Sequence, residues 1–378
     1  MTRLAEKVDI SELAAPGVRQ LTPYQPGKPI EELEREYGLD DVIKLASNEN
    51  PLGPSPDVLK AIYGRLGELS RYPDGNGFVL KQALCKRFDL EPGQITLGNG
   101  SNDVLELIAR AFVTPDNEVI FSQHAFAVYP LVTRAIGARA VVTPARARGH
   151  DLDAMREAIT GRTRLIFIAN PNNPTGTWLS KQALQDFLEQ IPPHVLVVLD
   201  EAYFEYASDP VMGLAQYPDG LQWLSKFSNL IVTRTFSKAY GLAGLRIGYA
   251  VSHPEVADYL NRVRQPFNVN HLALAAASAA LTDSAHLQRG VALNARGLQQ
   301  YYQAFDRLGL DYIPSAGNFV TVRVGPAAEI NEQLLRRGII VRPVANYELP
   351  EHLRISIGSE KENQRCIAAL GEILQAGG

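Results

Sequence analysis

A lysine and an aspartate each follow a run of apolar residues that predicts a buried β-strand. Lys238 comes shortly after the run 230–233, and Asp200 comes directly after the run 195–199. A lysine withdrawn from water has a lowered pKa and can form a Schiff base with a carbonyl compound. An aspartate at the carboxyl end of a parallel strand lies where α/β folds bind their ligands. Taken alone, each could instead be a surface lysine or a carboxylate that caps a helix.

Two turns rich in asparagine, glycine and proline also follow predicted strands. The sequence N-P-N-N-P-T-G at 170–176 holds two Asn–Pro bonds, which predicts a rigid turn with one or both bonds cis. The sequence G-N-G-S-N-D at 98–103 leads into a predicted helix, whose first backbone N–H groups can hold a phosphate. This second turn matches neither the G-x-G-x-x-G pattern nor the P-loop. Either turn alone could be an ordinary connection.

Together, the four segments describe one binding site. The segment T-F-S-K-A-Y-G-L-A-G-L-R places Arg246 eight residues after Lys238. Pyridoxal phosphate requires a lysine for an imine, an anion for its pyridinium nitrogen, and donors for its phosphate. Nicotinamide or ATP would not require a lysine and an aspartate in those places. The sequence therefore predicts a pyridoxal-phosphate site.

The elements that must position this site indicate an α/β sandwich. Short runs between 95 and 251 are apolar throughout rather than alternating, which is typical of strands buried on both faces of a mostly parallel sheet. Helix-like segments at 102–113, 127–137, 153–160 and 180–190 separate several of these runs. We expect a seven-stranded sheet covered by helices. Its strands are Ile95–Leu97, Glu118–Phe121, Ala140–Thr143, Leu165–Ile168, Val195–Leu199, Leu230–Thr233 and Ile247–Val251.

The pattern changes after about residue 265. An alanine-rich helical stretch at 271–309 precedes expected strands at 318–324, 339–342 and 353–357 and helices at 327–337 and 360–375. In the last strand, apolar residues alternate with Arg354 and Ser356, which predicts one apolar face. We expect three parts: an N-terminal arm at 1–48 that joins the small domain or a dimer contact, a large cofactor-binding domain at 49–265, and a small α+β domain at 266–378.

Composition excludes several classes of protein. The chain has 37 Lys and Arg against 41 Asp and Glu, so its net charge of −4 gives no broad basic surface for nucleic acid. Cys85 and Cys366 form no C-x-x-C pair, which predicts neither a disulfide framework nor a metal site. The longest apolar stretch, 272–281, is too short to span a bilayer, and the acidic N-terminus does not resemble a signal peptide. We expect a cytoplasmic protein with no nucleic-acid or membrane partner.

The order of the motifs resembles that of the fold-type I, class II pyridoxal-phosphate aminotransferases. The motifs are G-N-G-S-N-D, N-P-N-N-P-T-G, D-E-A-Y, T-F-S-K-A-Y-G-L-A-G-L-R and L-R-I-S-I-G. Near the N-terminus, L-T-P-Y-Q-P-G-K-P, S-N-E-N-P-L-G-P-S-P and R-Y-P-D-G are similar to the histidinol-phosphate aminotransferase branch. The resemblance spans nearly the whole chain. It implies a histidine-biosynthetic enzyme that interconverts L-histidinol phosphate and 2-oxoglutarate with imidazole-acetol phosphate and L-glutamate.

The resemblance also implies the roles of the residues around the cofactor. Lys238 would bind the cofactor and later shuttle a proton, and Asp200 would keep the pyridinium nitrogen protonated. Tyr203 and Asn173 would hydrogen-bond the phenolate oxygen of the ring. Phe126 aligns with an aromatic residue that stacks on the ring; many relatives have tyrosine there, so a hydrogen-bonding role for that hydroxyl is lost. The phosphate would be held by Ser101, Asn102, Ser237 and Arg246.

The same resemblance implies a homodimer and a set of substrate contacts. Tyr72, in R-Y-P-D, would reach the phosphate of the partner subunit's cofactor. Arg354 suits two-pronged binding of a carboxylate or phosphate, although a surface arginine on that strand would look the same. The substrate would be bound by Tyr24, Asn48, Arg342 and Arg354.

Three other functions remain open from the sequence. Aromatic-amino-acid transaminases share these motifs and also need an arginine at the mouth of the site. Pyridoxal-phosphate decarboxylases of phosphorylated amino acids use the same site. A non-catalytic regulator that binds the cofactor would need an added DNA-binding module, which the short arm does not resemble.

Overall fold

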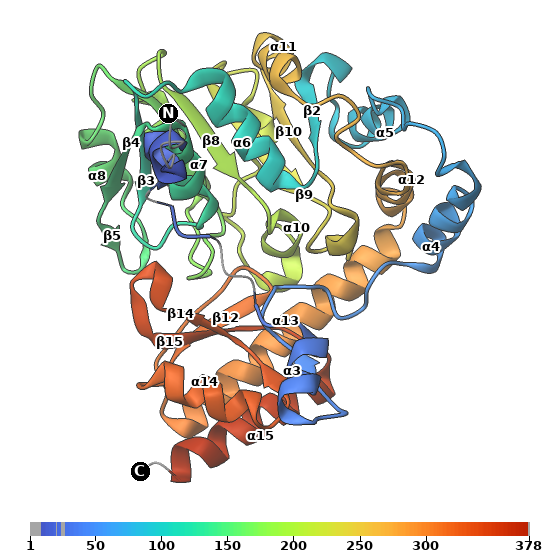
Figure 1. The fold of residues 1–378 in the computed structure, drawn as a ribbon, viewed down its shortest axis with the longest axis vertical. Coiled ribbons are helices and arrows are strands. Elements are labelled where there is room, and N and C mark those ends of the chain that lie inside the picture. The colour runs from blue at the N-terminus through green and yellow to red at the C-terminus, as the bar shows by residue number, and fades with distance from the viewer. Residues whose placement is uncertain (1–8, 20, 24–26, 377–378) are drawn as a thin grey trace, which may run out of the picture.

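Seven strands of the described residues form the large sheet, in the order β2-β10-β9-β8-β7-β3-β4. The computed structural model describes residues 9–19, 21–23 and 27–376 (Figure 1). β10 runs antiparallel to β2 and β9, and the remaining neighbours pair in parallel, which confirms the expected mostly parallel sheet. The strands are β2 (Ile95–Gly98), β3 (Glu118–Ser122), β4 (Arg139–Thr143), β7 (Thr163–Ala169), β8 (Leu196–Asp200), β9 (Leu230–Thr235) and β10 (Gly248–Ser252).

The central strands are apolar throughout because each of their faces contributes to a different core. In β7, Leu165 and Phe167 pack into one apolar cluster, whereas Ile166 and Ile168 pack into another on the opposite face. Successive side chains of a strand point to opposite faces, so both sets must be apolar when helices cover both sides.

Helices cover both faces of this sheet. One face is covered by α6 (Ser101–Phe112), α7 (Val128–Ile136) and α11 (Pro254–Val263). The other is covered by α4 (Pro56–Tyr63), α5 (Phe78–Phe88), α8 (Leu152–Glu157), α9 (Lys181–Glu189) and α12 (His271–Ala280). The short α10 (Phe204–Ala207) follows β8, and a small hairpin of β5 (Ala145–Arg146) and β6 (Gly149–His150) follows β4.

A smaller unit, drawn in orange and red in Figure 1, contains the antiparallel sheet β11-β12-β15-β14. Its long strand has the alternation expected from the sequence: Leu353, Ile355 and Ile357 lie in the core of this unit, with Arg354 and Ser356 between them. The elements are α13 (Ser284–Leu308), β11 (Tyr312–Ile313), β12 (Phe319–Arg323), α14 (Ala327–Leu335), β13 (Ile339–Ile340), β14 (Arg342–Val344), β15 (Leu349–Ser356) and α15 (Glu360–Ala376).

Two elements differ from the sequence expectation. The helical stretch expected at 271–309 is two helices, because Asp283 starts α13 by accepting a hydrogen bond from the backbone N–H of His286 at 2.9 Å. The alanines of α12 pack in the core under the large sheet, although the prediction assigns them to the small domain at 266–378. The strand expected at 339–342 is split, since β13 pairs with the arm and β14 pairs with β15.

The N-terminal arm contacts both units. Its strand β1 (Ile43–Lys44) pairs in parallel with β13, and Leu33 of α3 (Ile30–Tyr37) packs in one apolar cluster with Leu335 and Ile340. Of the short α1 (Ile10–Leu13) and α2 (Pro16–Arg19), α2 lies against α7 of the large unit. A Cβ on Gly17 would lie 1.9 Å from the carbonyl oxygen of Arg134, so this approach requires glycine.

Candidate active site

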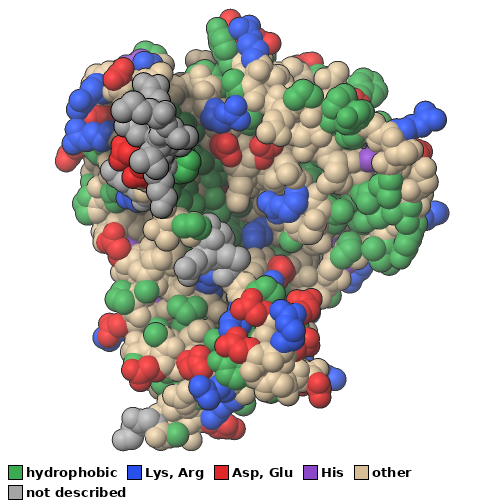
Figure 2. All heavy atoms as spheres, viewed as in Figure 1, with side chains coloured by type: hydrophobic (Ala, Val, Ile, Leu, Met, Phe, Trp, Pro, Cys, Tyr) green, Lys and Arg blue, Asp and Glu red, His purple; other side chains and the backbone are tan. Residues whose placement is uncertain are grey.

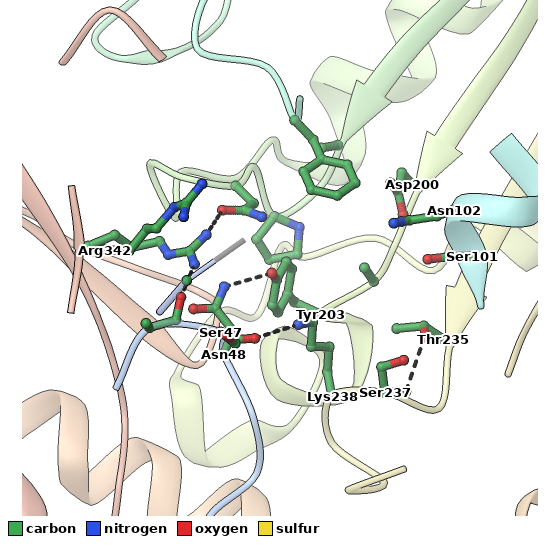
Figure 3. Close-up of a pocket in the computed structure, with 18 of the residues that line it drawn as sticks. Ser47, Asn48, Ser101, Asn102, Asp200, Tyr203, Thr235, Ser237, Lys238 and Arg342 are labelled. Atoms are coloured by element: carbon green, nitrogen blue, oxygen red, sulfur yellow. Dashed lines mark hydrogen bonds between the residues drawn. The ribbon is translucent and has the colours of Figure 1, made fainter. Parts of the chain in front are cut away.

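A cavity of about 190 Å³ lies at the carboxyl ends of β8 and β9, between the large unit, the arm and the small unit. Figure 3 shows Ser101 and Asn102 at the start of a helix beside Asp200, with Arg342 at the opposite end. The predicted residues that line the cavity are Asn48, Ser101, Asn102, Phe126, Asn173, Asp200, Tyr203, Ser237, Lys238, Arg246, Arg342 and Arg354. The structure therefore brings together residues that are up to about 300 positions apart in the sequence.

Lys238 follows the end of β9 and points into this cavity (Figure 3). Its Nζ donates a hydrogen bond to the backbone oxygen of Ser47 at 2.9 Å. Burial lowers the pKa of Lys238 to about 7, and the nearby cation of Arg354 acts in the same direction. A substantial fraction of this amine is therefore unprotonated near neutral pH, which a nucleophilic lysine requires.

Asp200 is the last residue of β8 and is buried. Its two carboxylate oxygens accept hydrogen bonds from two hydroxyls, that of Tyr129 at 2.8 Å and that of Thr233 at 3.1 Å. Burial raises the pKa of Asp200, and these hydrogen bonds oppose the rise. A buried carboxylate whose partners are neutral hydroxyls is suited to pairing with a cation in the adjoining cavity.

The first turn of α6 forms the third side of the cavity, and Arg246 lies against it. Gly100 precedes the helix with a φ of +84°, and a Cβ there would lie 2.4 Å from Nη2 of Arg246. Nη1 of Arg246 lies 3.4 Å from the Ser237 hydroxyl. A guanidinium, a hydroxyl and a helix N-terminus thus converge on one corner, a donor set that matches a phosphate group.

The Asn–Pro turn holds one amide at the opposite side of the cavity. The Asn170–Pro171 and Asn173–Pro174 peptide bonds are both cis. Oδ1 of Asn173 accepts a hydrogen bond from Nη1 of Arg354 at 2.5 Å, and Nη2 of Arg354 donates to the backbone oxygen of Ala46 at 2.6 Å. Arg354 is therefore fixed by the large unit and by the arm at once.

Tyr203 and Asn48 extend this hydrogen-bond network. Nδ2 of Asn48 donates to the Tyr203 hydroxyl at 2.9 Å, and Oδ1 of Asn48 accepts from the Ser356 hydroxyl at 2.9 Å (Figure 3 shows the first of these bonds). Burial raises the pKa of Tyr203 to about 12, so its hydroxyl stays protonated. Arg342 lies directly across from Arg354 in the register of β14 and β15, so both arginines lie on one side of the cavity.

One predicted residue of the described chain does not line its own cavity, and another cannot be placed. Tyr72 is 81% exposed and stacks on Phe267. Tyr24 lies outside the described residues. Phe126 lines the cavity, and its ring meets Tyr129 edge-on at 5.9 Å between centroids.

Some of the described residues at the site were not among those predicted from the sequence. Thr233 and Tyr129 bind Asp200, Ser47 accepts from Lys238, and Tyr347 lines the cavity. Thr233 could have been found from the pairing of strands β8 and β9, which sets it opposite Asp200, whereas Tyr129 lies among apolar residues of α7 and gives no signal. Ser47 contributes a backbone carbonyl and Tyr347 lies in a single turn of 3-10 helix, so neither gives a signal in the sequence.

Two absences hold for the described residues. No group of three or more His, Cys, Asp or Glu side chains among them could hold a metal ion. Within the same ranges, no helix has the length and apolarity to cross a membrane.

Comparison with known proteins shows the family to which the chain belongs. Residues 40–370 match the model of aminotransferase class I and II. The chain is 59% identical to histidinol-phosphate aminotransferase 1 of Nitrosococcus oceani, with 96% of this chain and 97% of the relative covered. It is 56% identical to histidinol-phosphate aminotransferase of Methylobacillus flagellatus, with 99% of both covered.

A solved structure has the same fold. The histidinol-phosphate aminotransferase from Sinorhizobium meliloti, in complex with pyridoxal-5'-phosphate, superposes with a TM-score of 0.87 at 32% identity, covering 96% of this chain and 98% of the other. The match of the family model over most of the chain and the near full-length identity to these relatives lead to one conclusion. The chain belongs to the aminotransferase class I and II family.

Proposed function

We propose that this protein is a pyridoxal-phosphate-dependent aminotransferase that interconverts L-histidinol phosphate and 2-oxoglutarate with imidazole-acetol phosphate and L-glutamate. The observation that carries the proposal is the placement of a buried lysine, a buried carboxylate and a phosphate-binding corner around one cavity that two arginines also line. The histidinol-phosphate aminotransferases that match over nearly their full length support the choice of substrate over an aromatic amino acid.

The side chains present fit pyridoxal phosphate. Ser237, Arg246 and the first turn of α6 would hold its phosphate in the corner that Gly100 keeps open. Phe126 would pack on one face of its ring, and Asp200 would pair with its nitrogen. Asn173 and Tyr203 would donate hydrogen bonds to its ring oxygen. When bound, the cofactor accepts the electron pair that is left when the substrate Cα loses its proton.

The protein's own groups supply binding and proton transfer. Lys238, with a pKa of about 7, can take a proton from the Cα of the amino substrate in one half-reaction. In the other half-reaction it can return a proton to the Cα of the oxo substrate. Asp200 stabilises positive charge on the ring nitrogen, since its carboxylate is held by two hydroxyls in a buried position. Arg354 and Arg342 would bind the phosphate of one substrate and the carboxylates of the other.

We also propose that the active unit is a homodimer. An exposed apolar face lies along 52–79, and it includes α4, which lies on the right of Figures 1 and 2. A face of this extent on a monomer is typical of a protein–protein interface. Its exposed members are Leu52, Leu59, Tyr63, Leu66, Leu69, Tyr72, Phe78 and Val79. Tyr72 within it would reach the phosphate in the partner's cavity.

We propose a cytoplasmic location and no nucleic-acid or membrane partner. The small polar substrates named above and the net charge of −4 support this proposal.

A half-reaction tests the substrate directly. The protein loaded with cofactor is mixed with L-histidinol phosphate or, separately, with L-phenylalanine, and the visible absorbance of the lysine-bound cofactor is followed. Rapid loss of absorbance with histidinol phosphate, and slow loss with phenylalanine, is the expected result. A preference for phenylalanine would assign the protein to the aromatic-amino-acid transaminases. Release of carbon dioxide from a phosphorylated amino acid would indicate a decarboxylase.

A further inference from the structure

Tyr72 is held by a second aromatic residue rather than by burial. Its ring stacks on Phe267 with 4.7 Å between centroids and 20° between planes. Both rings remain open to solvent, at 81% and 44% exposure. A stacked pair this exposed contributes little to the core of its own chain, so its geometry needs another explanation.

The backbone of Phe267 adopts a conformation that a bulky residue rarely takes. Its φ is +58°, in the left-handed region that favours glycine. Such a residue persists when its surroundings hold it there, and such positions cluster at functional sites. A phenylalanine at this position therefore indicates that the orientation of its ring serves a function.

Hydrogen bonds on both sides of Phe267 hold it in place. Arg264 donates to the side-chain oxygen of Asn268 at 2.8 Å. Nδ2 of Asn268 in turn donates to Oδ2 of Asp103 at 2.8 Å and to the backbone oxygen of Leu97 at 3.2 Å. Asp103 lies in the first turn of α6, so the support of Phe267 is tied to the phosphate-binding corner of the same chain.

The loop that carries Tyr72 turns around the Phe267 ring. A Cβ on Gly75 would lie 3.3 Å from Cδ1 of Phe267, so the loop contacts the ring at a second point beyond Tyr72. Asp74 fixes the far side of the loop, because its carboxylate accepts from the backbone N–H groups of Asn76 at 2.9 Å and Phe78 at 2.7 Å. The ring of Phe267 thus contacts the turn at both Tyr72 and Gly75 and supports its conformation.

We propose that Phe267 is a positioning residue that presents Tyr72 to the cofactor phosphate in the partner's cavity. The inference rests on the homodimer and on the role of Tyr72 in the proposed function. Phe267 itself touches neither substrate nor cofactor in this arrangement; it acts through the direction in which it holds the tyrosine hydroxyl.

The first test measures the equilibrium dissociation constant of pyridoxal phosphate for full-length variants, with sedimentation velocity on each to establish the dimer. Phe267→Leu removes the stack, and Phe267→Tyr keeps it. Tyr259→Leu is the matched control, since Tyr259 is also exposed and its ring meets that of Phe112, the last residue of α6, at the opposite end of that helix from the phosphate-binding corner. We expect the constant to rise about three- to tenfold in Phe267→Leu, as in Tyr72→Phe, and to stay at the wild-type value in Phe267→Tyr and Tyr259→Leu.

The second test asks in which subunit the effect is felt. In one hybrid dimer, a wild-type subunit is paired with a subunit that carries Lys238→Ala and Phe267→Leu. The single lysine-bound cofactor of this hybrid lies in the wild-type subunit and is followed by its visible absorbance. It should dissociate faster than in the wild-type dimer, because the Tyr72 that contacts it comes from the altered subunit. In the other hybrid, Phe267→Leu is in the subunit that keeps Lys238, and dissociation should match wild type.

The outcomes separate this inference from the proposal beneath it. If Tyr72→Phe leaves cofactor binding unchanged, the role of Tyr72 is wrong and the inference falls with it. If Tyr72→Phe weakens binding but Phe267→Leu does not, the inference alone is overturned. A monomeric Phe267→Leu protein, or a defect confined to the altered subunit's own site, would also overturn it.

Discussion

At the scale of single residues, the reactivity of Lys238 is set by its surroundings. The amine is buried, and Arg354 and Arg246 place positive charge near it, while Glu49 opposes them. Each of the first three influences disfavours the ammonium form. The lysine is therefore activated before any substrate arrives, and one of the groups that activates it belongs to the small unit.

This environment predicts a pH dependence for cofactor uptake. Only the neutral amine reacts with an aldehyde, and its fraction grows as the pH rises through the Lys238 pKa of about 7. The rate at which the cofactor-free protein takes up pyridoxal phosphate, measured by stopped flow, should therefore rise through that pH. Arg354→Gln should move the midpoint upward. Arg342→Gln, which removes the other small-unit arginine that lines the cavity, should move the midpoint less; an equal shift in both variants would contradict the assignment.

Asp200→Asn should separate cofactor binding from turnover. The amide has nearly the same shape, and its oxygen can accept from one of the two hydroxyls while its NH2 group donates to the other, but it cannot hold a proton on the ring nitrogen. We expect cofactor binding to persist while kcat falls by roughly a hundredfold or more. Turnover near the wild-type rate would show that the carboxylate does not have this role.

Part of the site could be predicted from residue type and spacing. Lys238 and Asp200 stand out because each follows an apolar run, and the end of a buried strand is where a polar side chain meets a ligand. Tyr129 is hidden among apolar helix residues, and only the fold brings it to Asp200. Ser47 acts through its backbone oxygen, which every residue type possesses. The resemblance to a known family supplied the roles of Asn173, Tyr203 and Arg354, which spacing alone does not give.

At the scale of elements, the start of α6 depends on one glycine. Gly100 combines a φ of +84° with a close approach to Arg246. The strands around this glycine were predicted from apolar runs, because a strand that is buried on both faces shows no alternation of apolar and polar residues. The break between α12 and α13 was missed, since alanine favours helix throughout that stretch and a single capping aspartate decides where the second helix begins.

Gly100→Ala should weaken the hold on the cofactor phosphate. The new Cβ would force the Arg246 guanidinium away, and a lost charge-assisted hydrogen bond corresponds to a rise of roughly ten- to a hundredfold in the dissociation constant of pyridoxal phosphate. Gly213→Ala is the control, because it has a φ of +70° with nothing within 4 Å of the added atom. The dissociation constants are measured by cofactor absorbance; a similar loss in both variants would attribute the effect to backbone strain alone.

At the scale of the whole molecule, the small unit is docked on the Asn–Pro turn. Ala316 donates its backbone N–H to the oxygen of Gly176 at 2.9 Å, and the Thr321 hydroxyl donates to the oxygen of Pro174. A Cβ on Gly176 would lie 2.3 Å from Oγ of Ser315 and 2.9 Å from its Cα. The position of Arg354 over the cavity therefore depends on a close contact between backbones of the two units.

Gly176→Ala should push the small unit away and weaken substrate binding. We expect KM for histidinol phosphate to rise about tenfold or more, with a smaller change in cofactor affinity, because Arg354 moves while Lys238 stays. Gly309→Ala, with a φ of +67° and open space around the added atom, controls for strain. Steady-state kinetics and cofactor titration measure the two effects; an unchanged KM would mean that the units absorb the extra atom without moving.

The pairing of β1 with β13 has a consequence for how the chain is made. Ile43 pairs with Ile339, which is synthesised 296 residues later. Contacts this distant in sequence form late, because a long loop must close before they give any stabilisation. During synthesis on the ribosome, β1 is therefore unpaired until β13 has been made. The apolar residues Leu33 and Ala46 likewise have no Leu335 or Ile340 to pack against while the large unit is completed. A nascent chain that stops before about residue 340 keeps this edge exposed, which makes such truncated chains targets for chaperones and proteases.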